Sequence, residues 1–115
     1  MGRKPRPAMS EYASVWLIAM FDLPVKERDE RREYRQFHDL LVSEGFLRLQ
    51  FSVYARYFQS EEASEARRRR LCVSLPPGGQ VRLLSVTDHQ FGKMEVFHGK
   101  LRAEPERRPE QLSLF

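Results

Sequence analysis

The alternation of apolar and polar residues predicts five strands and two helices. Tyr12 to Phe21 is a continuous apolar run and predicts a buried central strand. Shorter segments of strand-like composition predict the remaining strands: 46–50, 52–58, 81–87 and 94–97. The segment from Lys26 to Glu44 has no Gly or Pro and predicts an amphipathic helix, with apolar residues at helical spacing: Tyr34, Phe37 and Leu41. A second helix is predicted from Ser60, a favourable N-cap, to about Leu75, before Pro76–Gly79.

The order of these elements predicts an α+β fold, a ferredoxin-like βαββαβ sandwich with an extra C-terminal strand. Right-handed crossovers would place both helices on one face of the sheet. The strand 52–58 carries apolar residues on both faces, with Val53 and Tyr57 on one side and Tyr54 on the other. A sheet that is apolar on both faces needs a second layer, so we expect a homodimer packed sheet against sheet. The alternative is an RNA-binding sheet face with exposed aromatic residues, but Trp16 and Phe21 fall on opposite faces of their strand.

Length and composition narrow the class of protein. A chain of 115 residues accommodates one domain, which we place at 12–99, between a basic arm at 1–11 and a tail at 100–115. No apolar run approaches the roughly 20 residues that span a bilayer, so no membrane association is expected. The single cysteine, Cys72, excludes an internal disulfide and fits a cytoplasmic location. One Cys and three scattered His also argue against a structural zinc site.

Arginine dominates the basic residues. The net charge is +4, but the arm contributes +2 and the tail +1, so the domain itself is nearly balanced. Of the 20 basic residues 16 are Arg, whose planar guanidinium binds phosphate in a bidentate manner. At 100° per residue Arg28, Arg32 and Arg35 share one side of the first helix, and Arg67 and Arg68 lie on the second. These arginines are our candidates for contacts to double-stranded DNA, and solvated ion pairs with the interleaved Glu residues are the alternative.

Five segments, in order, resemble the CRISPR-associated protein 2 family, in a variant similar to those of type II systems. They are Phe21-Asp22-Leu23-Pro24, Arg31-Arg32-Glu33-Tyr34-Arg35, Gly45-Phe46, Gln50-Phe51-Ser52-Val53-Tyr54-Ala55-Arg56 and Leu75-Pro76-Pro77-Gly78-Gly79-Gln80-Val81-Arg82. The resemblance covers about residues 13–98 and implies the same fold and a two-fold homodimer. It also implies spacer acquisition, in which the homodimer bridges two dimers of the CRISPR integrase and foreign DNA lies across it.

The resemblance further places a metal ligand at Asp22, where the first strand ends. Mg²⁺ usually takes one or two carboxylates and several waters, so two copies of Asp22 near a two-fold axis would suffice. Asp22 is therefore the candidate catalytic and metal-binding residue of a metal-dependent endoribonuclease or endodeoxyribonuclease, which is the alternative function. The competing interpretation is that Asp22 caps the first helix. A second alternative is a non-catalytic ferredoxin-like module that binds a protein partner.

The C-terminal tail ends in Gln111-Leu112-Ser113-Leu114-Phe115, with three apolar residues after a polar spacer: Leu112, Leu114 and Phe115. We expect these residues to bind a partner. The tail could add a strand to the edge of a sheet in the sister subunit or the integrase, as the family often does. Alternatively, the segment resembles the short peptides that dock bacterial DNA enzymes on the replication sliding clamp. We favour strand addition, because edge pairing accepts many sequences.

Overall fold

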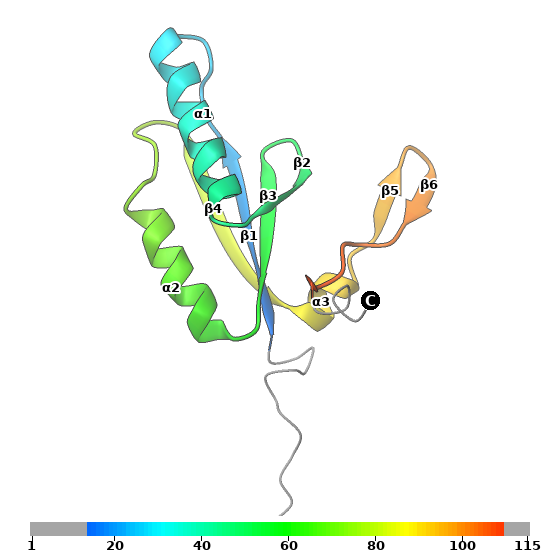
Figure 1. Ribbon diagram of the computed structural model, residues 1–115. Coiled ribbons are helices and arrows are strands. Elements are labelled where there is room, and N and C mark those ends of the chain that lie inside the picture. Colours follow the sequence, from blue (N-terminus) through cyan, green and yellow to red (C-terminus); the bar gives the residue numbers. More distant parts are fainter. Residues whose placement is uncertain (1–13, 110–115) are drawn as a thin grey trace, which may run out of the picture.

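The computed structural model describes residues 14–109 and confirms the α+β class (Figure 1). Its elements are β1 (Val15–Asp22), α1 (Arg28–Ser43), β2 (Leu47–Gln50), β3 (Val53–Phe58), α2 (Glu61–Cys72), β4 (Gln80–Thr87), α3 (Asp88–Gly92), β5 (Val96–His98) and β6 (Leu101–Ala103). The main sheet has the order β2-β3-β1-β4 with antiparallel neighbours throughout. Each βαβ unit therefore skips one strand, which is the arrangement expected of the ferredoxin-like sandwich.

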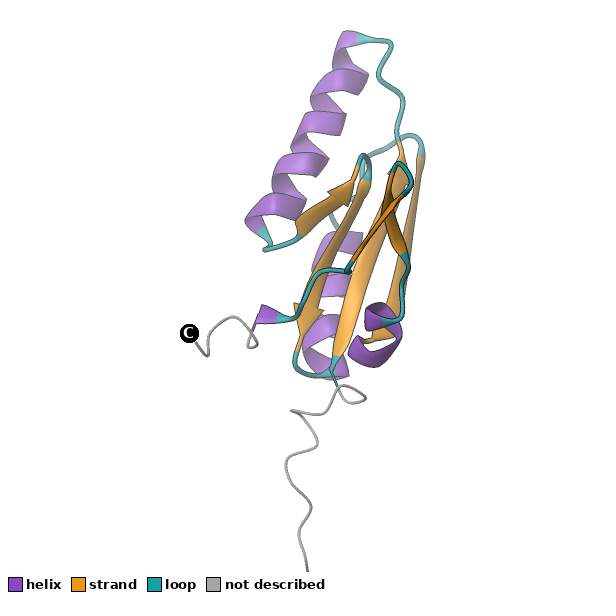
Figure 2. Cartoon of the chain, turned by 90° about the vertical axis from the view of Figure 1, so that its right-hand side faces the viewer, coloured by secondary structure: helices purple, strands orange, loops and turns teal. Residues whose placement is uncertain are grey.

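The two long helices cover one face of the sheet, as the crossover rule predicts (Figure 2). The core on this side joins alternate residues of β1 to the apolar stripe of α1, which includes Phe37 and Leu41. Leu71 of α2 completes it and is fully buried. The periodic pattern of the sequence thus identifies the residues that hold α1 on the sheet.

The other face of the sheet is apolar as well, but it is not left entirely open. Trp16, Ile18, Ala55 and Tyr57 form a second buried cluster with Phe91 of α3. The rings of Trp16 and Phe91 are stacked, with centroids 4.1 Å apart. Part of the second layer that this face needs is therefore supplied within one chain, because α3 folds back over the end where β1 begins. Toward the end where β1 stops, Met20 and Val53 stay half-buried and Leu84 is 49% exposed.

Helix boundaries follow local capping. The backbone N–H of Glu27 donates to Glu30 Oε1 at 2.9 Å, which completes a capping box at the start of α1. Glu27 and not Asp22 is therefore the N-cap, and the interpretation of Asp22 as a helix cap is wrong. Ser60 caps α2 as predicted by accepting a hydrogen bond from Ala63 N at 3.2 Å. Gly45 ends α1 with φ of +88°, a conformation that favours glycine.

The C-terminal region holds more structure than the sequence predicts. Helix α3 replaces a predicted loop and places His89 on a helix, with Thr87 and Gln90 forming a capping box. Strand β6 lies inside the predicted tail and pairs with β5 in a two-stranded sheet of its own (Figure 1). The extra strand predicted at 94–97 is thus one arm of a hairpin separate from the main sheet. The predicted arm at 1–11 lies outside the described residues. Among residues 14–109 no helix is long and apolar enough to cross a membrane.

Candidate nucleic-acid interface and metal position

The exposed side of α1 carries three arginines in two different states. Arg28 and Arg35 are exposed and have no ion-pair partner among residues 14–109. Arg32 pairs with Asp29 at 3.1 Å, but both side chains are more than half exposed, so solvent weakens this pair. All three predicted residues therefore present guanidinium groups to solvent along one helix.

Arg31, which is not among the candidate DNA-binding arginines, has a structural role at the same end of the helix. Its guanidinium donates to the carbonyls of Val25 and Lys26, at 3.3 and 2.6 Å. These bonds fix the loop between β1 and α1. In the sequence, the one indication of this role is that Arg31 lies one turn into a helix that follows a loop with Pro24.

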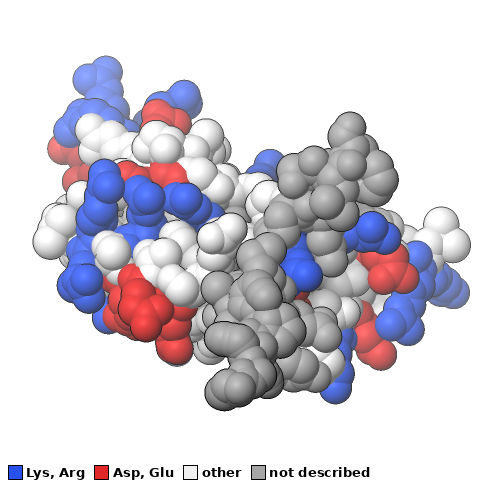
Figure 3. Space-filling view, turned by 60° about the horizontal axis from the view of Figure 1, so that its bottom comes forward, with Lys and Arg blue, Asp and Glu red and all other residues white. Residues whose placement is uncertain are grey.

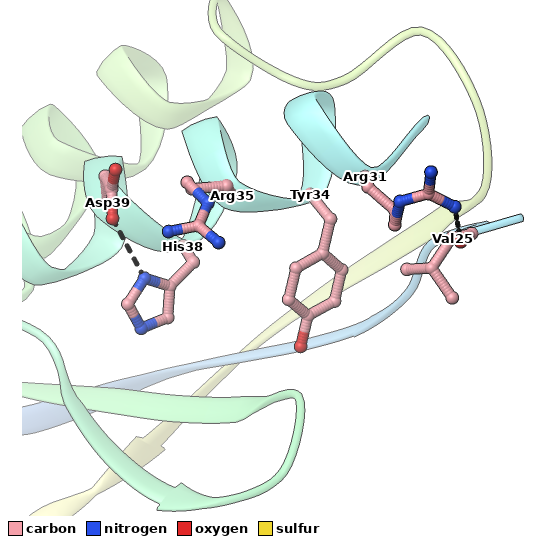
Figure 4. A pocket seen from close by; sticks show the side chains of 6 residues that line it. All are labelled: Val25, Arg31, Tyr34, Arg35, His38 and Asp39. Carbon is pink, nitrogen blue, oxygen red and sulfur yellow. Dashed lines mark hydrogen bonds and ion pairs between the residues drawn. The ribbon is translucent and has the colours of Figure 1, made fainter. Parts of the chain in front are cut away.

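An open cavity of about 430 Å³, with a mainly apolar surface, lies against α1 (Figure 4). Its lining consists of Val25, Arg31, Tyr34, Arg35, His38 and Asp39. His38 Nδ1 and Asp39 Oδ1 are 3.1 Å apart, and Tyr34 points toward the β2–β3 turn. The cavity therefore combines an aromatic ring with one unpaired guanidinium, that of Arg35.

Three of the four arginines of α2 are engaged in ion pairs. Arg67 and Arg70 both contact the carboxylate of Glu44, whose side chain is 11% exposed, and Arg68 pairs with Glu65 at 2.6 Å. Figure 3 shows basic and acidic side chains next to one another on the α2 side. The structure thus places Arg67 and Arg68, both predicted to contact DNA, in pairs that a phosphate would have to replace.

Arg56 of β3 completes this ion-pair group. Its guanidinium donates to the main-chain carbonyl of Glu44 at 2.6 Å, at the C-terminal end of α1. Burial lowers the pKa of Arg56, the positive charge of Arg67 lowers it further, and Glu44 opposes both effects. The group joins the end of α1 to β3 and α2. This structural role accounts for the burial of the Glu44 side chain.

Asp22 is exposed at the end of β1, opposite Gln80 in β4. A small cavity of about 180 Å³ lies beside it, lined also by Met20, Phe21 and Arg82. Within residues 14–109 no three His, Cys, Asp or Glu side chains come together as a metal site. One chain thus supplies a single carboxylate here, within the one or two carboxylates that Mg²⁺ usually takes.

Gly79 allows the chain to pass very close to the backbone of Asp22. Its φ is +80°, and a Cβ at this position would lie 2.6 Å from the carbonyl oxygen of Asp22. The Pro76–Gly79 segment, interpreted from the sequence as a helix stop, therefore also packs directly on the end of β1. In the sequence, the second glycine of the Gly78-Gly79 pair is the feature that indicates this close packing.

Among the described residues the histidines and Cys72 do not come together in one site. The His38 ring packs edge-on against Tyr54, at 5.7 Å between centroids, and burial raises the pKa of the Tyr54 hydroxyl. His98 is exposed in β5, and Cys72 is exposed at the end of α2. Leu112, Leu114 and Phe115 lie outside the described residues. The chain leading to them is attached to the domain, because Arg108 pairs with Asp88 at 3.5 Å.

Comparison with known proteins gives one consistent result. The family model described as CRISPR associated protein Cas2 matches residues 15–94. The chain is 39% identical to the CRISPR-associated endoribonuclease Cas2 of Flavobacterium psychrophilum, over 93% of each chain. It is 42% identical to the protein of the same name from Parvibaculum lavamentivorans, over 88% of this chain and all of the relative. These matches run through all four strands of the main sheet and both long helices, and the chain therefore belongs to the Cas2 family.

Proposed function

We propose that this protein acts in CRISPR adaptation, in the cytoplasm, as a homodimer that binds duplex DNA and bridges the dimers of the CRISPR integrase. Membership of the Cas2 family supports a role in adaptation. The observation that carries the DNA-binding part is the exposed side of α1. Arg28 and Arg35 are unpaired among the described residues, and Arg32 has only an exposed partner. Such guanidinium groups bind the phosphates of DNA whatever its base sequence. A two-fold axis would double the number of these groups.

Charge reversal at Arg28 and Arg35 tests the DNA-binding part. We expect Arg28→Glu with Arg35→Glu to weaken duplex binding at least tenfold and to lower the salt slope by about 2. The matched control reverses Lys100 and Arg102, two exposed basic residues at the β5–β6 hairpin, with the same change in net charge. Binding would be followed by fluorescence anisotropy at several salt concentrations. Equal losses in both double variants would refute a specific role for α1.

The homodimer is supported by the half-buried apolar residues that α3 leaves uncovered on the second sheet face, among them Met20 and Val53. Light scattering at low micromolar concentration should give about twice 13.6 kDa. A pull-down with the integrase encoded beside it should then recover both proteins. A monomer at these concentrations would exclude both the bridging role and a metal ion shared between two copies of Asp22.

Metal-dependent endonuclease activity is the second candidate, because the relatives are named endoribonucleases. Asp22 of both subunits would hold the ion, and Mg²⁺ bound there would supply polarisation of a phosphate. Labelled RNA and DNA should then be cut only with Mg²⁺, and Asp22→Asn should abolish the cleavage while integrase assembly persists. Loss of assembly in this variant would assign Asp22 a structural role.

The tail is proposed to bind a partner through Leu112, Leu114 and Phe115. Deleting 109–115 should weaken integrase binding if the tail adds a strand to a sheet edge. Docking on the sliding clamp predicts instead that a peptide of residues 109–115 binds purified clamp, and that Phe115→Ala abolishes the binding.

A further inference from the structure

Three polar side chains surround the small cavity at the end of β1. Asp22, Gln80 and Arg82 line it, and Met20 and Phe21 complete the lining. In the antiparallel ladder Asp22 is opposite Gln80 and Met20 is opposite Arg82, so these four side chains project from the same face of the sheet. Figure 1 shows the end of β1 beside the start of β4. Two strands that are far apart in the sequence thus bring a carboxylate, an amide and a guanidinium to one place.

The guanidinium of Arg82 interrupts a face that is otherwise apolar. Leu84 and Val86 follow it on the same face of β4 and are opposite apolar residues of β1. Arg82 is exposed, and among residues 14–109 its side chain has neither an ion pair nor a hydrogen bond. The side chains of Asp22 and Gln80 are likewise exposed and unpaired within the described ranges. All three polar groups are therefore available to a ligand that enters the cavity.

We propose that Arg82 and Gln80 bind the phosphate of the nucleic-acid strand that reaches Asp22, and that Arg82 is a positioning residue of this site. The Asp22 carboxylate repels a phosphodiester, and a guanidinium on the same face offsets that repulsion. A guanidinium can donate to both free oxygens of a phosphodiester, and the Gln80 amide adds a further donor. The cavity of about 180 Å³ is smaller than the usual small-molecule site of about 300 Å³ or more, so its size suits one phosphate group.

This inference rests on the proposed endonuclease, because it names the group of the substrate that lies beside the Asp22 carboxylate. Arg82 forms and breaks no bond in it and only holds the phosphate. A two-fold axis that brings two copies of Asp22 to one ion brings two copies of Arg82 there as well, since both residues line the same cavity. The guanidinium groups and the ion would together offset the negative charge of the carboxylates and the phosphate.

The test measures binding of a uridine dinucleotide, whose single linkage is a phosphodiester, and of the same dinucleotide with a neutral methylphosphonate linkage. In an NMR titration with Mg²⁺ wild-type protein should bind the phosphodiester more tightly, with a shift of the Arg82 Nε–Hε signal. Arg82→Gln should weaken phosphodiester binding at least fivefold and leave methylphosphonate binding unchanged. Arg82→Lys keeps the charge without the planar fork and should lose about twofold.

The matched control is Arg102→Gln, which removes the same charge from an exposed residue of β6 and should leave both affinities at wild-type values. In cleavage of labelled RNA, Arg82→Gln should raise KM more than it lowers kcat. Thermal unfolding and light scattering of each variant check that the fold and the oligomeric state are retained.

The dinucleotides separate this proposal from the function on which it rests. If Arg82→Gln leaves phosphodiester binding unchanged while nucleic acid is still cut in an Asp22-dependent manner, the phosphate site is refuted and the endonuclease stands. If phosphodiester binding depends on Arg82 and neither RNA nor DNA is cut, the phosphate site stands and the endonuclease fails. If the protein neither prefers the phosphodiester nor cuts nucleic acid, both are refuted. A monomeric Arg82→Gln with unchanged phosphodiester binding would assign Arg82 to an ion pair across the two-fold axis and overturn the proposal.

Discussion

Replacing Gly79 by Ala is expected to be the most damaging glycine-to-alanine change among residues 14–109. The added Cβ would lie 2.6 Å from the carbonyl oxygen of Asp22 and 2.8 and 2.9 Å from two atoms of Leu23. Real Cβ atoms do not approach backbone so closely, so the 74–79 loop or the end of β1 has to move. The φ of +80° adds a second cost, because a residue with a Cβ is strained there.

Two other glycines allow the cost of backbone strain to be measured separately from the cost of the close contact. Gly99 has φ of +63° and open space around its Cβ position, so Gly99→Ala should cost only the backbone strain, about 1–2 kcal/mol. Gly78 lacks a positive φ and would meet only Pro24, at 3.8 Å, so Gly78→Ala should be neutral or stabilise by about 0.5 kcal/mol. Gly79→Ala combines strain with overpacking and should cost about 2–5 kcal/mol.

Urea unfolding of the three variants at one protein concentration measures these free energies, and the m-values should stay equal. In Gly79→Ala the amide resonances of Asp22 and Leu23 should shift more than those of any residue in α2. Equal destabilisation by Gly79→Ala and Gly99→Ala would show that the close approach at Asp22 contributes nothing. The reasoning from the Cβ contacts would then be refuted.

Two further predictions concern paired side chains. Asp88 accepts from Trp16 Nε1 at 2.7 Å and pairs with Arg108, and the Asp88 and Arg108 side chains are 14% and 18% exposed. Asp88→Ala should therefore lower the free energy of unfolding by about 2–4 kcal/mol, while Asp88→Asn, which keeps an acceptor, should cost less; equal losses in calorimetry would contradict this. The hydrogen bond from Arg68 lowers the pKa of Glu65, so this pair stabilises the fold above the unfolded pKa and loses that effect as pH falls through the folded pKa. In an NMR titration Arg68→Gln should raise the Glu65 midpoint, and an unchanged midpoint would show that the pair does not form in solution.

Long periodic segments made the fold predictable from the sequence. The apolar run of β1 and the spacing of Phe37 and Leu41 in α1 each reflect the surface that they bury. Short elements gave no such signal. Helix α3 has five residues, too few for a helical period, and only the Thr87–Gln90 capping pattern marked it.

The candidate site was predictable in part for the same reason. Helical spacing groups Arg28, Arg32 and Arg35 on one side of α1 without any tertiary information. The pairing of Arg67 with Glu44 depends on the packing of two helices whose residues are far apart in the sequence, and no local pattern encodes it. The meeting of Asp22 and Arg82 at one cavity likewise depends on the pairing of β1 with β4, which no local pattern encodes.

The position of β1 at the centre of the sheet has a consequence for synthesis of the protein. Both of its hydrogen-bonding partners, β3 and β4, follow it in the chain, and Val15 pairs with Thr87. The most apolar strand is therefore made before its partners, and one of its edges stays unpaired until β3 has been made and the other until β4 has been made. During translation it is an exposed strand that other nascent chains or chaperones can bind. Slow folding is expected from the same topology, because the native sheet cannot close before the chain is nearly complete.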